Sequence, residues 1–225
     1  MISMKSPTHR VVLLLLGVVG HATAFAALTG EQLAAKGTSA GAPSCTTCHG
    51  PTGQGQAAAG FPRLASMDAK YLARQLAAFA DGSRVNPIMG PVAKLLTAPE
   101  MTSVSEFYAG IPAMKQPGDG PTAPVTSEGT SLALKGDWNN GLPACSQCHG
   151  PDGLGVGASF PQLAGQSAAY LKAQIMAWKT GARKGEPLGL MQGVASKLSD
   201  AQVSAVTDFY ASLPAAAARS SKVKP

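Results

Sequence analysis

Two copies of a five-residue motif constrain this chain more than any other feature. Residues 45–49 read CTTCH and residues 145–149 read CSQCH, and both continue into Gly-Pro-x-Gly-x-Gly. This C-x-x-C-H spacing is typical of covalent haem attachment, in which two thiols bond the haem vinyl groups and the histidine ligates iron. Two copies therefore predict two haem c groups in one polypeptide. The expected attachment residues are Cys45, Cys48, Cys145 and Cys148.

Other uses of the four cysteines remain open from their number alone. An exported protein with an even number of cysteines usually forms disulfides. A four-cysteine zinc site and a redox-active C-x-x-C pair would also fit. The histidine in both copies, the shared flanking residues and the export signal described next favour haem attachment.

The first 26 residues have the features of a secretory signal peptide. Lys5 and Arg10 form a positive region, and residues 11–20 are apolar but too short to span a bilayer comfortably. Small residues at 22 and 24, and at 24 and 26, give two candidate cleavage sites. We therefore expect export to a bacterial periplasm, with an uncleaved membrane anchor as the alternative.

The net charge becomes modest once the signal peptide is removed. Lysines and arginines drop from 18 to 16 against 12 acids, so the formal charge falls from +6 to +4. Each ferric haem with two ionised propionates adds about −1, which brings the oxidised protein to about +2. Because basic and aromatic residues are not interleaved, we expect no nucleic-acid partner.

The sequence similarity between the halves extends well beyond the motifs. F-P-x-L-A recurs at 61–65 and 160–164, Y-L-x-x-Q at 71–75 and 170–174, and G-x-R at 82–84 and 181–183. Self-similarity at a fixed period indicates repeated structural units. The expected boundaries are 1–26 for the signal peptide, 27–114 for the first domain, 115–126 for a Pro/Gly-rich linker, 127–214 for the second domain, and 215–225 for a tail.

Each half is expected to be all-α, because no segment alternates convincingly as a strand would. Thr97 and Ser199 are suitable N-caps for the last helix of each half, and Asp68 or Ser66 for an earlier one. Domains of this size bury limited apolar surface, so the haem would supply much of each core. The expected helices cover residues 31–36, 68–80, 127–134 and 168–180, with a last helix starting at 97 or 199.

The sixth iron ligand separates an electron carrier from an enzyme. His9 and His21 leave with the signal peptide, and the motifs use the other two histidines, so Met, Lys, Tyr or an open position remains. Of six methionines in the mature chain, only Met89 and Met191 occupy equivalent positions of the repeat, 40 and 42 residues after their histidines. The predicted ligand pairs are His49 with Met89 and His149 with Met191. Filled axial positions favour electron transfer over catalysis.

Several other side chains carry two interpretations. Pro62 and Pro161 are candidate carbonyl acceptors for the histidine rings, or ordinary loop prolines. Arg84 and Arg183 are candidates to pair with haem propionates, or solvated arginines. Core packing is expected for the remaining large apolar side chains, Met67, Met101, Met114, Met176, Trp138 and Trp178.

These motifs together resemble the cytochrome c4 family, periplasmic di-haem electron carriers of bacteria, over nearly the whole mature chain. The resemblance implies two tandem class I cytochrome c folds, each wrapped around one haem c, with their propionate edges facing. It also implies electron delivery from a quinol-oxidising complex of the quinol–cytochrome c reductase type to a terminal oxidase. Peripheral contact with those membrane complexes would follow. The Met191 segment is longer than its counterpart, so the ligand loops differ between the halves.

Three functions are compatible with these features. The first is a periplasmic carrier in a respiratory chain, which is not an enzyme. The second is the cytochrome subunit of a periplasmic dehydrogenase, such as a sulfide-oxidising flavoprotein. The third is an enzyme, either a di-haem peroxidase or a thiosulfate-oxidising cytochrome, and the matched ligands of the two halves disfavour it.

Overall fold

The computed structural model describes residues 28–114 and 120–215, and the regular secondary structure of these residues is entirely helical. Isolated bridges are the only β-type pairing within these ranges. The all-α prediction is confirmed. The predicted signal peptide, part of the linker and nearly all of the tail lie outside the described residues. No helix in the described ranges is long and apolar enough to cross a membrane.

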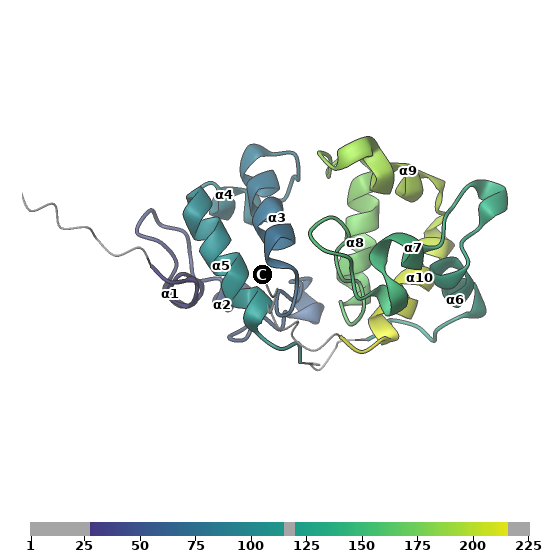
Figure 1. Ribbon diagram of the computed structural model, residues 1–225, viewed down its shortest axis with the longest axis horizontal. Helices are drawn as coiled ribbons and strands as arrows, with labels where there is room; N and C mark the ends of the chain where they lie inside the picture. The colour runs from purple at the N-terminus through teal and green to yellow at the C-terminus, as the bar shows by residue number, and fades with distance from the viewer. Residues whose placement is uncertain (1–27, 115–119, 216–225) are drawn as a thin grey trace, which may run out of the picture.

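The two halves contain the same main helices in the same order (Figure 1). The last helix of each half packs on the first and on the long middle helix: α5 on α1 and α3, and α10 on α6 and α8. The first half contains α1 Gly30–Lys36, α2 Thr46–His49, α3 Ala69–Asp81, α4 Met89–Ala93 and α5 Ala98–Gly110. The second contains α6 Ser127–Leu134, α7 Cys145–His149, α8 Ala168–Lys179, α9 Leu190–Lys197 and α10 Asp200–Ser212.

The helix starts follow from local sequence. Thr97 and Ser199 cap α5 and α10, each within a complete capping box that includes the side chain three residues later. Asp68 caps α3 by accepting a hydrogen bond from the backbone N–H of Tyr71, and Ser66 does not. The predicted N-caps at 97 and 199 are therefore confirmed, and the choice between Asp68 and Ser66 is settled for Asp68.

Each half has its own small apolar core, which includes Leu33 and Tyr108 in the first half and Leu132 and Tyr210 in the second. Of the six side chains predicted as core, Met67, Met101 and Trp178 are buried and Met176 is half-buried, but the other two are exposed. Trp138 is 64% exposed and Met114 is 47% exposed. Trp138 stands in a 3-10 turn, Trp138–Asn140, next to Gly141, and Met114 follows the end of α5. Their large apolar surface had suggested burial, and that prediction was wrong.

The motif loop approaches the last helix so closely that only glycine fits. Gly153 has φ +69°, and a Cβ atom there would lie 2.5 Å from the Tyr210 ring. Gly53 stands in the same relation to Tyr108, with φ +67° and the same 2.5 Å. The glycines of the Gly-Pro-x-Gly segment therefore hold the histidine loop against α5 and α10.

A Gly153→Ala substitution should lower the free energy of unfolding substantially. The left-handed backbone alone costs about 1–2 kcal/mol with a side chain present. Contact with the Tyr210 ring should add about 1–3 kcal/mol of overpacking. The matched control is Gly157→Ala, because Gly157 also has φ +53° but nothing within 4 Å of the added Cβ. Denaturant unfolding of the two variants should show the larger loss in Gly153→Ala, and equal losses would contradict the close approach.

The two halves face each other through α3 and α8 (Figure 1). Backbone pairing joins them at the loops that follow these helices. The N–H of Val85 donates to the carbonyl of Ala182 (2.7 Å), and the N–H of Lys184 donates to that of Ser83 (2.6 Å). Arg84 and Arg183 thereby lie opposite each other in an antiparallel bridge.

Candidate haem sites

Each motif histidine is buried and held by one hydrogen bond. His49 Nδ1 lies 2.9 Å from the carbonyl oxygen of Pro62, and His149 Nδ1 lies 2.8 Å from that of Pro161. A carbonyl only accepts, so each Nδ1 carries the proton and each Nε2 keeps a free lone pair, as a metal ligand requires. The carbonyl groups of Pro62 and Pro161 therefore orient the histidine rings, which is the first of the two interpretations given for these prolines.

The F-P-x-L-A motif is explained by its contacts around the histidine. In the second half, the Phe160 ring lies 6.2 Å from the His149 ring between centroids, and Pro161 supplies the carbonyl. The N–H groups of Leu163 and Ala164 both donate to the carbonyl of Gly153, at 2.8 and 3.1 Å. The first half repeats every one of these contacts. The motif thus fixes the ring plane of the ligand histidine relative to the motif loop.

Burial keeps the histidines and the first cysteines neutral. It lowers the pKa of His49 and of His149, while the proline carbonyl opposes the shift in each case and the charge of Arg183 further lowers that of His149. Burial also raises the pKa of Cys45, and it raises that of Cys145 to about 11. A neutral imidazole is the form that ligates iron.

The alternative uses of the cysteines find no support in the described residues. None of the four cysteines pairs in a disulfide, and no group of three or more His, Cys, Asp or Glu side chains converges in the described residues as a metal site would require. A four-cysteine zinc site is therefore excluded within these ranges. Adjacent unbridged thiols beside a histidine with a free Nε2 fit a covalently attached haem, with Cys45, Cys48, Cys145 and Cys148 as its anchors.

Met89 and Met191 occupy equivalent places at the start of a helix. Met89 is the first residue of α4 and Met191 the second of α9, and both side chains are half-buried. Different side chains hold the two loops. Asn86 Oδ1 accepts from the N–H of Met89 (2.8 Å), whereas Glu186 Oε1 accepts from that of Gln192 (2.6 Å). The extra residues of the second loop form a 3-10 turn, Pro187–Gly189.

The interpretation of Arg84 and Arg183 as solvated side chains was wrong. They are 6% and 7% exposed, and each guanidinium lies on an aromatic ring of its own half, at 4.4 Å from Phe79 and from Trp178. Both reach across the interface to the other half. Their partners there come from Y-L-x-x-Q, so the two remaining repeat motifs meet at this surface.

Sequence reasoning missed these partners as functional residues. Arg84 donates to Tyr170 and Gln174, and Arg183 donates to Tyr71 and Gln75. Their recurrence in both halves was a visible signal. A repeat shows that a residue matters in each unit, but not that it contacts the other unit, so the interface could not be deduced from it.

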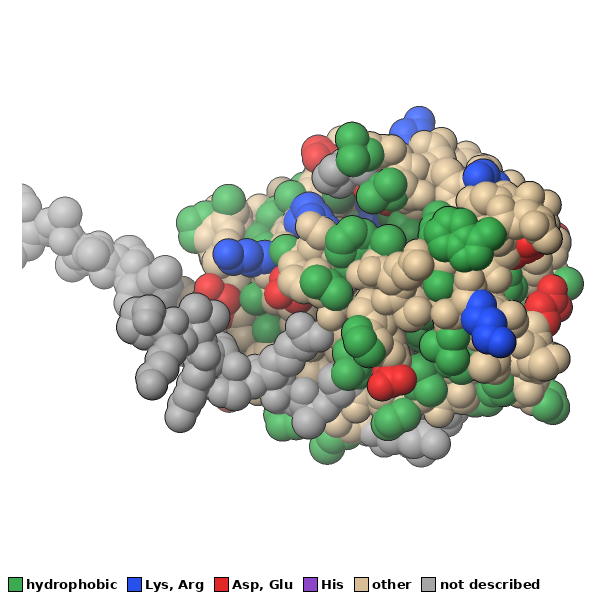
Figure 2. Space-filling model, turned by 45° about the vertical axis from the view of Figure 1, so that its right-hand side comes forward, with side chains coloured by type: hydrophobic (Ala, Val, Ile, Leu, Met, Phe, Trp, Pro, Cys, Tyr) green, Lys and Arg blue, Asp and Glu red, His purple; other side chains and the backbone are tan. Residues whose placement is uncertain are grey.

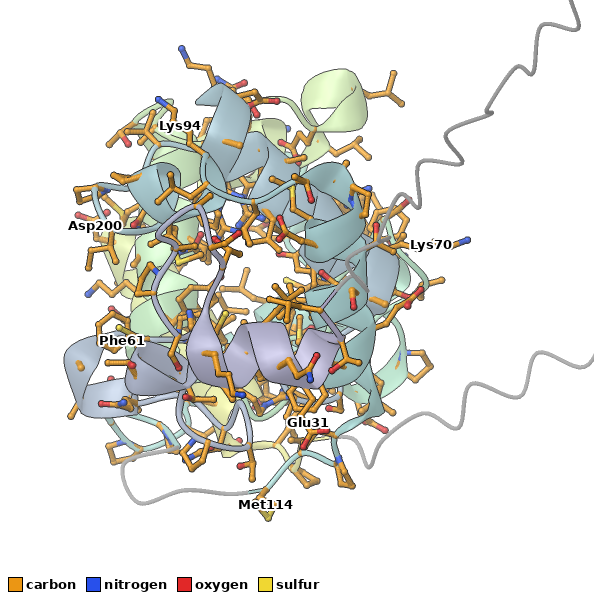
Figure 3. All side chains as sticks on the ribbon, turned by 90° about the vertical axis from the view of Figure 1, so that its left-hand side faces the viewer. Glu31, Phe61, Lys70, Lys94, Met114 and Asp200 are labelled. Atoms are coloured by element: carbon orange, nitrogen blue, oxygen red, sulfur yellow. The ribbon has the colours of Figure 1, made fainter. Side chains whose placement is uncertain are left out.

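Charged side chains outside the interface are dispersed. On the face shown in Figure 2, lysines and arginines stand apart from one another among acidic and apolar side chains. In the view of Figure 3, the labelled Lys70 and Lys94 side chains point away from the first half. Buried positive charge at the interface is therefore a different feature from the surface charge.

Comparison with known proteins places this geometry in a family. The cytochrome c family model matches residues 28–109 and 138–214, one match in each half. The cytochrome c4 of Thiocapsa roseopersicina is 37% identical over 75% of this chain and 86% of its own length. The expected resemblance to cytochrome c4 is thereby confirmed.

Two further relatives have names that refer to thiosulfate dehydrogenase. The thiosulfate dehydrogenase electron acceptor of Thiomonas intermedia is 49% identical over 81% of this chain and 84% of its own length. A solved thiosulfate dehydrogenase (TsdBA) of Marichromatium purpuratum superposes with a TM-score of 0.77 and 41% identity, over 82% of this chain. This chain spans 40% of that longer one.

The matches agree with the arrangement of the site residues. Both family matches include a motif histidine, its proline acceptor and the following methionine loop. The chain therefore belongs to the cytochrome c family as a di-haem electron carrier of the cytochrome c4 type, with two covalently bound haem c groups.

Proposed function

We propose that this chain is the electron acceptor of a periplasmic thiosulfate dehydrogenase. The observation that carries the proposal is the 49% identity to the thiosulfate dehydrogenase electron acceptor of Thiomonas intermedia over 84% of that protein. The Marichromatium purpuratum chain, which contains a region similar to this one, supports the same donor. The comparisons thus favour a cytochrome that serves a dehydrogenase over a carrier between a quinol-oxidising complex and a terminal oxidase. They point to thiosulfate rather than to a sulfide-oxidising flavoprotein.

The proposed iron ligands are His49 with Met89 and His149 with Met191. The haem iron supplies one-electron redox chemistry at each site. The protein's part is to orient the ligand: the Pro62 and Pro161 carbonyls fix the Nδ1 proton and aim Nε2 away from them. A histidine and a methionine on each iron raise the reduction potential relative to two histidines. Such sites suit acceptance of electrons without substrate binding at iron.

The location and the domain limits belong to the same proposal. A signal peptide over residues 1–26 would deliver the chain to the periplasm, where haem c proteins with such signals act. Domains at 27–114 and 127–214 would each carry one haem, joined by the linker at 115–126. The backbone pairing between the loops after α3 and α8 would keep the two haems in one relative orientation.

Reduction kinetics test the proposed donor. The oxidised holoprotein should be reduced rapidly when thiosulfate and a purified thiosulfate dehydrogenase are both present, because that enzyme would supply the electrons. Stopped-flow absorbance at the haem α-band measures the rate, with thiosulfate alone and enzyme alone as controls. A reduction rate with the enzyme no greater than with thiosulfate alone would contradict the proposal. Faster reduction by a quinol-oxidising complex than by the dehydrogenase would instead favour a carrier in a respiratory chain.

A further inference from the structure

A buried tyrosine of the last helix shares a core with the attachment motif in each half. Tyr108 of α5 and Tyr210 of α10 are each only 2% exposed. They occupy the same place in the repeated F-Y-A sequence near the end of the helix. Cys45 packs against the apolar core that includes Tyr108, and Cys145 packs against the core that includes Tyr210. The first cysteine of each motif therefore lies in the same small core as a buried phenol ring.

The hydroxyl groups of these two tyrosines are buried without an evident acceptor. Both oxygens are shielded from water, and neither makes a hydrogen bond with the residues that the structure describes. A buried hydroxyl without a partner loses the hydrogen bonds that water gives it in the unfolded chain, so such groups are rare in folded proteins. A phenylalanine ring would fill the same space without that loss. Two such hydroxyls at equivalent positions indicate an acceptor that arises when the holoprotein forms.

Electrostatic effects identify the first cysteine of each motif as the neighbour of the hydroxyl. Burial raises the pKa of Tyr108, and the charge of Cys45 raises it further. Burial likewise raises the pKa of Tyr210, and Cys145 adds to the increase through its charge and through hydrogen bonding. Even so, the Tyr210 hydroxyl and the Cys145 thiol do not reach full hydrogen-bond geometry. Each hydroxyl thus keeps its proton and lies near a cysteine sulfur.

Haem attachment changes the hydrogen bonds that this sulfur can make. As a thiol, Cys145 Sγ donates to the carbonyl oxygen of Leu132, at 3.8 Å. Attachment adds the S–H bond across a haem vinyl group, so that the sulfur bonds one vinyl carbon and the hydrogen goes to the other. The thioether sulfur then has no hydrogen of its own and serves only as a weak acceptor. After attachment, the neighbouring hydroxyl is the group that can donate.

We propose that Tyr108 and Tyr210 each donate a hydrogen bond to the thioether sulfur of the first attachment cysteine, Cys45 and Cys145 respectively. Each tyrosine is a positioning residue, because it holds the covalent bridge to the haem and does not touch the iron. Its ring packs so closely on the motif loop that a Cβ atom on the facing glycine would lie 2.5 Å away, which fixes the direction of the hydroxyl. The proposal rests on haem attachment and not on the identity of the electron donor.

The proposed hydrogen bond acts on the reduction potential of each haem. Hydrogen bonds around the groups that hold a metal centre tune its potential. A donor at the thioether withdraws electron density from the sulfur and, through the sulfur, from the haem. Because this disfavours the oxidised state, the hydrogen bond should raise the potential. Tyr108→Phe should therefore lower the potential of the first haem and Tyr210→Phe that of the second.

Resonance Raman spectroscopy of the reduced holoprotein tests the hydrogen bond itself, because the C–S stretching bands report on the thioether bridges. Tyr108→Phe and Tyr210→Phe should each shift part of the C–S band intensity, and the double variant should shift both parts. Native holoprotein prepared in deuterium oxide should also show a shifted C–S band, since the donated hydrogen is then deuterium. The isotope effect should be lost in the double variant.

The other two tyrosines of the chain provide the matched controls. Tyr71 and Tyr170 already have partners, because their hydroxyls accept hydrogen bonds from Arg183 and Arg84. Tyr71→Phe and Tyr170→Phe each remove one hydroxyl in the same way, and should leave the C–S bands unchanged. Equal shifts in these control variants would overturn the proposal, because they would show a general response of the haems to altered packing.

The C–S bands separate a hydrogen bond to the thioether from a merely structural role of the ring. Unshifted C–S bands in both Tyr108→Phe and Tyr210→Phe would overturn the proposal, even if stability or a reduction potential changes. If these variants fail to fold, the native protein decides the question. A C–S band that is the same in water and in deuterium oxide would then overturn the proposal.

Discussion

Replacement of Met191 by histidine is expected to lower the reduction potential of the second haem by about 0.2 V or more, within the roughly 0.8 V range that axial ligands cover. Thioether ligation raises the potential relative to a second imidazole. Met191 is the second residue of α9, as Met89 is the first of α4, and its side chain is half-buried. Met89→His should do the same to the first haem. Spectroelectrochemical titration of each variant measures both potentials.

The pattern across variants carries as much information as the size of the shift. Each substitution should move mainly one of the two potentials, which would assign each potential to its half. Met114→His is the control, because Met114 is 47% exposed after the end of α5 and has no ligand role in this account. If neither Met89→His nor Met191→His moves a potential, the ligand assignment is wrong.

Removal of the attachment thiols should unfold one half. In Cys45→Ser/Cys48→Ser no thioether can form, and the first half keeps only a small apolar core around Leu33 and Tyr108. The free energy of unfolding of a small domain is only about 5–15 kcal/mol in total. The stabilisation lost with the central cofactor should be larger than this. We expect the variant to lose about half of its helical circular-dichroism signal, since the halves have separate cores.

The corresponding double substitution in the second half is the control for which half unfolds. Cys145→Ser/Cys148→Ser should unfold the second half and leave one haem attached to the first. The ratio of haem absorbance to protein should fall by half in each double variant. A variant without either thioether that keeps full helical signal and full thermal stability would contradict the claim that the haem completes the core.

The sequence was sufficient for features that depend on local pattern. The capping residues Thr97, Ser199 and Asp68 could be identified because N-caps are short-range interactions. The His49–Pro62 and His149–Pro161 hydrogen bonds were one of two interpretations open from the sequence, suggested because a ligand histidine needs an acceptor for its second nitrogen. The repeat reduced six methionines to two candidates.

Features that depend on contact between the halves could not be predicted. Arg84 was considered a solvated side chain as readily as a propionate partner, because its burial comes from Tyr170 and Gln174, some 90 residues away in the sequence. The predicted burial of Trp138 was wrong for the opposite reason. Its large apolar ring suggested a core position, but the turn before the second motif places the ring at the surface.

The coordination of the two irons is the central claim, and carbon monoxide tests it most directly. The absorbance spectrum of the reduced native protein should not change when carbon monoxide is added, because methionine fills the sixth position of each iron. The spectrum of a Met191→Ala variant should change, since that substitution opens one position. Substantial carbon monoxide binding at either haem of the native protein would contradict the account of two closed electron-transfer sites.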